Sequence, residues 1–180
     1  MSAAPHRIVV TGGPGSGKTT LLDALGAAGW ARTEEAGRAI IREQLAIGGT
    51  ALPWDDRERF AELMLLRELR AHRAAPGGVV FFDRGVPDVL GYLRVEGLPE
   101  PEPARAAARE FRYAPRVLLA PPWPEIYRTD AERTQSPELA ARTCESLREV
   151  YAEHGYEVLE LPRASVADRV RFALDAAGAA

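Results

Sequence analysis

Short apolar runs alternate along this chain with longer stretches in which apolar residues recur every three or four positions. The short runs predict β-strands. The run at 79–82 is apolar at every position, as in a central parallel strand that is buried on both faces. The predicted strands cover 7–11, 30–33, 79–82, 117–120 and 156–161.

The longer stretches predict helices, because their apolar residues fall on one face and most of them end near glycine or proline. Their ranges are 17–28, 39–47, 55–74, 87–96, 104–112, 137–154 and 165–176. Strands that alternate with helices predict a three-layer α/β/α fold around a five-stranded parallel sheet. We expect 1–180 to form one domain, since 180 residues match the usual size of one.

The first predicted strand leads into GGPGSGKT at 12–19, which has the complete spacing G-x-x-x-x-G-K-[ST] between a strand and a helix. Glycines let backbone N–H groups turn toward an anion, and the helix start adds its positive dipole end. The strand before it and the helix after it disfavour a chance glycine-rich turn. The segment therefore predicts a nucleoside triphosphate site, formed by Gly12, Gly13, Pro14, Gly15, Ser16, Gly17, Lys18, Thr19 and Thr20.

Two residues of this loop have expected individual roles. Lys18 is placed to reach the β- and γ-phosphates, and the Thr19 hydroxyl is placed to bind Mg²⁺. Lys18 is also the only lysine in the chain. That single lysine excludes an Asn-Lys-x-Asp guanine motif, which favours ATP over GTP.

Ligands of such sheets bind beyond the carboxyl ends of the strands, and charged residues follow the predicted third strand. Asp83 is expected to hold Mg²⁺, usually through water, while the alternative is a cap of the next turn. Arg84 stands where dedicated ATPases have a second acid that polarises the hydrolytic water. The Asp-Arg pair therefore argues against a dedicated hydrolase and against a hexameric AAA+ motor.

The predicted second strand ends at Glu34 and Glu35, and Arg38 follows one helical turn later. Glu35 could act as a general base or accept a hydrogen bond from a substrate hydroxyl, with Arg38 binding the substrate. The alternative is a surface ion pair at a helix start. The position at a strand end favours the functional interpretation.

The segment at about 123–136 follows the fourth strand and carries Arg128 and Arg133. An arginine-bearing lid would stabilise the transferring phosphoryl group and exclude water, whereas the alternative is a solvated helix. Trp54, Phe60 and Arg67 lie where a second substrate is expected. Aromatic residues at helical spacing are, however, more often part of the core.

Charge and composition limit the kinds of partner that this protein is expected to bind. The formal net charge is −3 and no strongly basic patch stands out, so no nucleic-acid partner is expected. No apolar run approaches the roughly 20 residues of a membrane span, and the start of the chain lacks the apolar core of a signal peptide. We therefore expect a soluble cytoplasmic protein without a membrane partner. A homodimer would be ordinary for such a fold.

The layout resembles the nucleoside and nucleotide kinases of the P-loop NTPase superfamily, such as thymidylate kinase, deoxynucleoside kinases and the nicotinamide riboside kinase domain. GGPGSGKTT, EEAGRAIIREQ, FFDRG and APPWPEIYRTDAER resemble more closely a group of small bacterial proteins labelled AAA-family or predicted ATPases. This second resemblance covers nearly the whole chain. The first resemblance, to the kinases, implies a P-loop kinase-like fold that uses ATP and Mg²⁺.

The kinase resemblance also implies roles. In deoxynucleoside kinases the acid after the second strand is the base on the acceptor hydroxyl, and Glu35 matches that place, with Glu34 as its rival. An acid-Arg-Ser triplet follows their third strand, whereas this chain has Asp83, Arg84 and Gly85. Their lid arginines are spaced differently from Arg128 and Arg133.

Together these patterns favour a Mg²⁺·ATP-dependent kinase for a small hydroxylated molecule such as a nucleoside or nucleotide. The alternative is a nucleotide-dependent switch or slow ATPase that acts through a protein partner. The expected catalytic residues are Lys18, Glu35, Asp83, Arg84, Arg128 and Arg133. The metal ligands are Thr19 and Asp83, and the substrate-binding residues are Glu35, Arg38, Trp54, Arg67 and Arg84.

Overall fold

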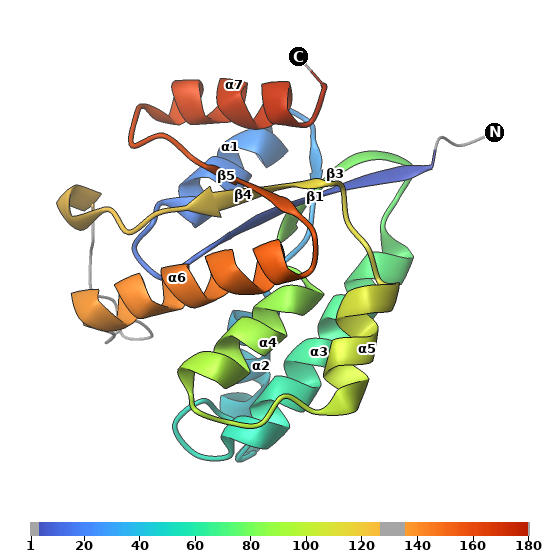
Figure 1. Cartoon of the computed structure of the whole chain (residues 1–180), viewed down its shortest axis with the longest axis vertical. Helices are drawn as coiled ribbons and strands as arrows, with labels where there is room; N and C mark the ends of the chain where they lie inside the picture. Colours follow the sequence, from blue (N-terminus) through green and yellow to red (C-terminus); the bar gives the residue numbers. More distant parts are fainter. Residues whose placement is uncertain (1–3, 127–135, 180) are drawn as a thin grey trace.

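The computed structural model describes residues 4–126 and 136–179. Its centre is a parallel sheet with the strand order β2-β3-β1-β4-β5 (Figure 1). The strands are β1 (Pro5–Gly12), β2 (Ala31–Arg32), β3 (Gly78–Asp83), β4 (Arg116–Ala120) and β5 (Glu157–Glu160). The predicted five-stranded parallel sheet is confirmed.

Helices cover both faces of the sheet (Figure 1). One face is covered by α1 (Lys18–Ala27) and α7 (Val166–Ala176), and the other by α4 (Val86–Val95) and α6 (Pro137–Glu153). Helices α3 (Arg57–Ala74) and α5 (Glu102–Glu110) pack against α4, and α2 (Ala36–Ile47) packs against α3. The three-layer α/β/α fold is thereby confirmed.

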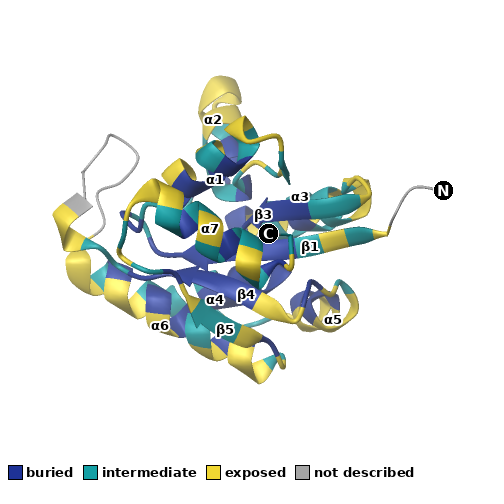
Figure 2. Ribbon diagram, turned by 90° about the horizontal axis from the view of Figure 1, so that it is seen from above, coloured by how far each residue is buried: buried dark blue, intermediate teal, exposed yellow. Residues whose placement is uncertain are grey.

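The alternation of side chains along β1 and β3 divides the core into two layers, because successive strand residues point to opposite faces. Ile8 and Phe81 pack with the apolar residues of α1 and α7. Val9 and Phe82 pack instead with those of α4, α5 and α6. Figure 2 shows the strands buried at the centre and exposed residues on the outer helices, such as the end of α2. This two-sided burial explains why the 79–82 run is continuously apolar.

Most predicted elements agree with the observed ones to within two residues. Helix α2 begins earlier than expected, at Ala36, so Glu35 is its N-cap residue. Helix α3 begins two residues later than expected, at Arg57, and the carboxylate of its N-cap residue Asp56 accepts a hydrogen bond from the Arg59 N–H at 3.0 Å. Ser165 caps α7 in the same way, with the Asp168 N–H at 3.2 Å. In the described ranges, no helix combines the length and apolar character that a membrane crossing requires.

Candidate active site

A cleft of about 1020 Å³ lies at the carboxyl ends of the central strands. The loop at 13–20 lines one part of the cleft, and residues of α3 and α4 line another. Glu35, Arg38 and Arg84 also line it. The fold therefore brings the loop, the end of β2 and the end of β3 together in one cleft, as the sequence predicts.

The phosphate loop depends on glycine at specific positions. Gly17 ends the loop at φ 72°, a left-handed conformation that residues with a side chain rarely adopt. Within the loop, the Ser16 hydroxyl donates a hydrogen bond to the Gly13 carbonyl at 2.8 Å. These contacts hold the loop in a curved shape in front of the α1 N-terminus, which suits an anion.

Gly12 does not line the cleft, so its assignment to the nucleotide site stays a prediction. A Cβ atom at Gly12 would lie 2.3 Å from the Ala120 carbonyl oxygen of β4. Gly12 therefore permits close packing of β1 and β4 at the entry to the loop.

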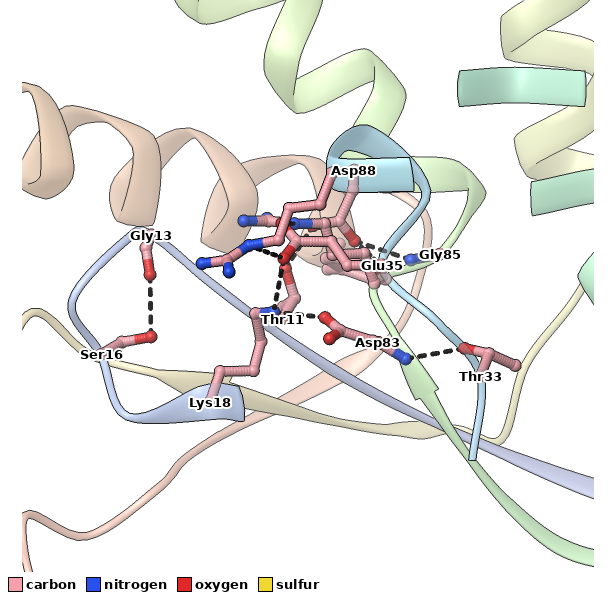
Figure 3. Close-up of polar contacts among 12 residues, drawn as sticks. Thr11, Gly13, Ser16, Lys18, Thr33, Glu35, Asp83, Gly85 and Asp88 are labelled. Carbon is pink, nitrogen blue, oxygen red and sulfur yellow. Dashed lines mark hydrogen bonds and ion pairs between the residues drawn. The ribbon is translucent and has the colours of Figure 1, made fainter. Parts of the chain in front are cut away.

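Lys18 and Asp83 form a buried ion pair at the start of α1, which Figure 3 shows. The Asp83 backbone N–H also donates to the Thr33 hydroxyl at 3.0 Å, which ties the end of β3 to the end of β2. Burial raises the pKa of Asp83, and Lys18 opposes this shift. Thr19 lines the cleft beside this pair, and it lies on the first turn of α1.

The donors at this position fit a magnesium ion. Mg²⁺ prefers oxygen ligands and is usually held by one or two protein groups together with substrate phosphates. The Thr19 hydroxyl and the Asp83 carboxylate supply that chemistry. Their lysine neighbour suits the phosphates themselves.

Glu35 sits among three cations. Its carboxylate lies 3.0 Å from the Arg84 Nε, 3.0 Å from the Arg38 Nε and 4.0 Å from the Lys18 Nζ. Burial alone would raise the pKa of Glu35, but Lys18, Arg84 and Arg38 together lower it to about 2. Its rival Glu34 points away to an exposed ion pair with Arg42 and does not line the cleft. Of these two adjacent acids, the structure therefore places Glu35 in the cleft.

Arg84 adopts φ 74°, and it is the only residue other than glycine with positive φ in the described part of the chain. Its guanidinium bridges Glu35 at 3.0 Å and Asp88 at 3.1 Å. Such strain persists only where surrounding contacts fix the residue, and it is common at functional sites. These two carboxylates hold Arg84 in the cleft.

Asp88 is a residue that sequence reasoning missed. It lies on the first turn of α4 and accepts hydrogen bonds from the Thr11 hydroxyl at 2.5 Å and the Tyr151 hydroxyl at 2.6 Å. It also accepts the Gly85 N–H at 3.0 Å (Figure 3). Asp88 thus connects β1, α4 and α6 behind Arg84. The Gly-x-x-Asp spacing at the helix start was its only sequence signal.

Arg169 of α7 is a second missed residue. Its guanidinium donates to the Gly17 carbonyl at 3.2 Å and the Ser16 carbonyl at 3.0 Å. It also lies 5.6 Å from the centre of the Trp123 ring, and both residues line the cleft. Arg169 therefore fixes the phosphate loop from a position about 150 residues away in sequence, where no local motif could identify it.

The far part of the cleft is lined by α3 and α4. Phe60, Met64 and Glu68 follow one another at four-residue spacing on α3, and the Tyr92 ring of α4 lies 5.5 Å from the Phe60 ring. Trp54 stands at the surface of the cleft with 63% of its area exposed. The structure thus places Trp54 and Phe60 where the sequence predicts a second substrate.

Arg67 does not join these residues. Its guanidinium forms an ion pair with Glu43 of α2, and Arg67 does not line the cleft. Its assignment as a substrate-binding residue is therefore not supported by its position. Arg128 and Arg133 lie outside the described residues, so the two lid arginines stay predictions.

The strand order and the phosphate loop together define a kinase-like P-loop α/β fold, which nucleoside kinases also have. The sequence model of an AAA domain matches residues 7–169, and the chain belongs to this AAA domain family. No curated protein matches the sequence.

Several solved structures share the fold at low sequence identity. Deoxyadenosine kinase from M. mycoides, with the products dCMP and dCDP, has a TM-score of 0.67 and 13% identity over 94% of this chain and 96% of its own. NadR in complex with NR has a TM-score of 0.68 and 23% identity over 97% of this chain, which spans 50% of NadR. Shikimate kinase from Acinetobacter baumannii, with shikimate, has a TM-score of 0.58 and 17% identity over 94% of this chain and 90% of its own.

Proposed function

We propose that this protein is a Mg²⁺·ATP-dependent kinase that phosphorylates a hydroxyl group of a small molecule. The observation that carries the proposal is the position of Glu35. Its ionised carboxylate faces Lys18, Arg84 and Arg38 in the cleft that the phosphate loop also lines. An acceptor hydroxyl beside Glu35 would therefore stand next to the γ-phosphate.

The phosphate side of the reaction needs positive charge and fixed N–H donors. The loop amides and Lys18 would hold the β- and γ-phosphates, while Thr19 and Asp83 would hold Mg²⁺, which neutralises charge on the phosphates. Lys18 would leave Asp83 as it turns to the phosphates, which frees the carboxylate for the metal ion. Complexes of structural relatives fit this assignment, since NadR has been solved with AMP-PNP.

On the acceptor side, the proton of the acceptor hydroxyl would pass to Glu35. The acceptor oxygen forms a bond to the γ-phosphorus, the bond from this phosphorus to the β–γ bridging oxygen breaks, and ADP leaves. Glu35 accepts the hydrogen bond of the acceptor hydroxyl and receives its proton as the new bond forms. Because Lys18 helps to lower the pKa of Glu35, its turn to the phosphates would make Glu35 a stronger base.

Dedicated hydrolysis is less well supported. No second acid follows Asp83, and Arg84 in its place is engaged by Glu35 and Asp88. The alternative is a switch or slow ATPase that acts through a protein partner. It would leave the Glu35 carboxylate and the arginines beside it without an acceptor to bind.

The test is ADP release from Mg²⁺·ATP with and without pools of nucleosides, nucleotides and small hydroxylated metabolites. Strong stimulation by one pool, followed by detection of the phosphorylated product, would support the kinase. A slow rate that no pool changes would favour the switch or slow ATPase, and partners recovered only with nucleotide would then be sought.

A further inference from the structure

Among the described residues, Glu68 is the one acid lining the cleft that forms no ion pair. It lies on α3, its residue is 4% exposed, and it lines the cleft. Among the described residues it makes no hydrogen bond or ion pair. In the same residues, the fully enclosed side-chain polar atoms without a partner are the Tyr92 hydroxyl and the Arg169 Nε. The Glu68 carboxyl therefore keeps access to the cleft.

Arg84, the cation that acts on Glu68, and the two other cations beside Glu35 are already engaged by other carboxylates. Arg84 bridges Glu35 and Asp88, Arg38 pairs with Glu35, and Lys18 pairs with Asp83. Burial raises the pKa of Glu68, Asp88 and Asp83 raise it further, and Arg84 only partly opposes them. A buried carboxyl in this position gains most from a positive charge that a ligand brings with it.

The surroundings of Glu68 also suit a cation. Phe60 and Met64 precede it on the same face of α3, and the Tyr92 ring stands against Phe60. Aromatic faces attract cations through their electron-rich surface, most strongly where water is displaced. The far part of the cleft thus combines one unpaired acid with an apolar and aromatic wall.

We propose that Glu68 is the specificity-determining residue of the acceptor site and selects hydroxylated acceptors that carry a positively charged nitrogen. The proposal rests on the kinase function proposed above and names its substrate class. In this arrangement the charged nitrogen group binds against the rings of Phe60 and Tyr92 and takes the place of the Glu68 proton, which is released to solvent as the carboxylate gains its counterion. The acceptor hydroxyl then lies toward Glu35, near the phosphate loop.

The test measures binding, without transfer, to the full chain in the presence of AMP-PNP and Mg²⁺. The probes are pairs of similar shape that differ in charge. They are nicotinamide riboside with its neutral dihydro form, and glucosamine with glucose. We expect the charged member of at least one pair to bind about tenfold or more tightly than its neutral partner, the size of a hydrogen bond to a charged group.

Variants of Glu68 test whether this residue causes the preference for charged probes. Glu68→Gln keeps the volume of the side chain and should reduce the preference to about twofold or less, whereas Glu68→Asp should retain part of it. Glu62→Gln is the matched control, because Glu62 is exposed on the same helix. It should behave as wild type.

Three results would overturn the proposal. They are equal or tighter binding of the neutral members, no binding of any charged member, and a preference that survives in Glu68→Gln. A protein that binds charged probes through Glu68 but never phosphorylates an acceptor would instead contradict the kinase function. Binding of charged probes without phosphoryl transfer would therefore contradict only the kinase function. Phosphoryl transfer without a preference for charged acceptors would contradict only the role of Glu68.

Discussion

The two parts of the cleft differ in how their charged groups are satisfied. The phosphate part is the part of the cleft that the loop at 13–20 lines. There, Lys18 pairs with Asp83, and Arg169 donates to two loop carbonyls. In the far part, Glu68 is buried beside apolar and aromatic residues, and it has no counterion within 4–126 and 136–179. Between them, Glu35, Arg84 and Asp88 form a continuous set of ion pairs.

This difference indicates what each part does. A site for a constant ligand such as a polyphosphate can hold its charges in internal pairs that open when the ligand arrives. A group that stays unpaired in the protein instead reserves its interaction for a ligand, and a ligand that lacks the matching group leaves it unsatisfied. In the proposed kinase, the phosphate part would therefore provide binding and catalysis, and the far part would provide selection.

Loss of Lys18 tests the phosphate part and should have the largest effect. Lys18→Ala removes the cation placed for the β- and γ-phosphates, so acceptor-stimulated ADP release should fall about 10³-fold or more. Arg32→Ala is a suitable control, because Arg32 forms an exposed ion pair with Asp23. Substantial turnover by folded Lys18→Ala, with circular dichroism like wild type, would contradict the assignment.

Glu35 and Glu34 offer a comparison of adjacent residues. Glu35→Gln removes the carboxylate that orients the acceptor, so kcat should fall about 10²-fold while the KM for ATP changes by less than about threefold. Glu34→Gln alters an exposed ion pair and should leave both constants within about twofold. Steady-state kinetics with the stimulating acceptor measure both. Equal losses of ATP binding and transfer in Glu35→Gln would instead assign a structural role to Glu35.

The phosphate part could be predicted from sequence because its chemistry is local. One strand, one loop and the first turn of one helix contain Gly13, Lys18 and Thr19 in a fixed spacing. Asp83 and Glu35 could also be predicted, since they follow strands whose carboxyl ends meet at one edge of the sheet. Register within the sheet then places them side by side.

The far part could not be predicted, because helical spacing does not show which neighbour a helix face meets. Arg67 and Glu68 are adjacent, yet Arg67 turns to Glu43 of α2 and Glu68 turns into the cleft. The available signal was a charged residue four positions after Met64 and eight after Phe60. Arg169 had no such signal, since its contacts with the loop depend on the packing of α7 against α1.

Asp88 tests the connection between the two parts. The Asp88 carboxylate accepts hydrogen bonds from the Thr11 and Tyr151 hydroxyls and forms an ion pair with Arg84. Asp88→Asn removes its negative charge and so weakens all three contacts. The free energy of unfolding should fall by about 1–3 kcal/mol, as for other buried hydrogen bonds that involve a charged group. Urea denaturation measures it, with Asp23→Asn as the exposed control. A loss no larger than that of the control would show that Asp88 does not organise this region.

The smallest expected effect is on stability, and it isolates Glu68 from its ligand. Because burial raises the pKa of Glu68 in the folded protein, the unfolded chain releases this proton above about 4.5 while the folded protein keeps it. Folding then takes up a proton, so the Glu68 contribution to stability falls as the pH rises above that value. Asp88, Asp83 and Glu35 strengthen this effect, and Arg84 weakens it.

Glu68→Gln removes the titrating group, so the melting temperature of this variant should match that of wild type near pH 4.5 and exceed it by about 2–4 °C at pH 8. Differential scanning calorimetry over this range, with Glu62→Gln as control, measures the change. A difference between Glu68→Gln and wild type that stays constant or shrinks with pH would show that Glu68 is already stabilised as a carboxylate, and the far part of the cleft would then lose its contrast with the phosphate part.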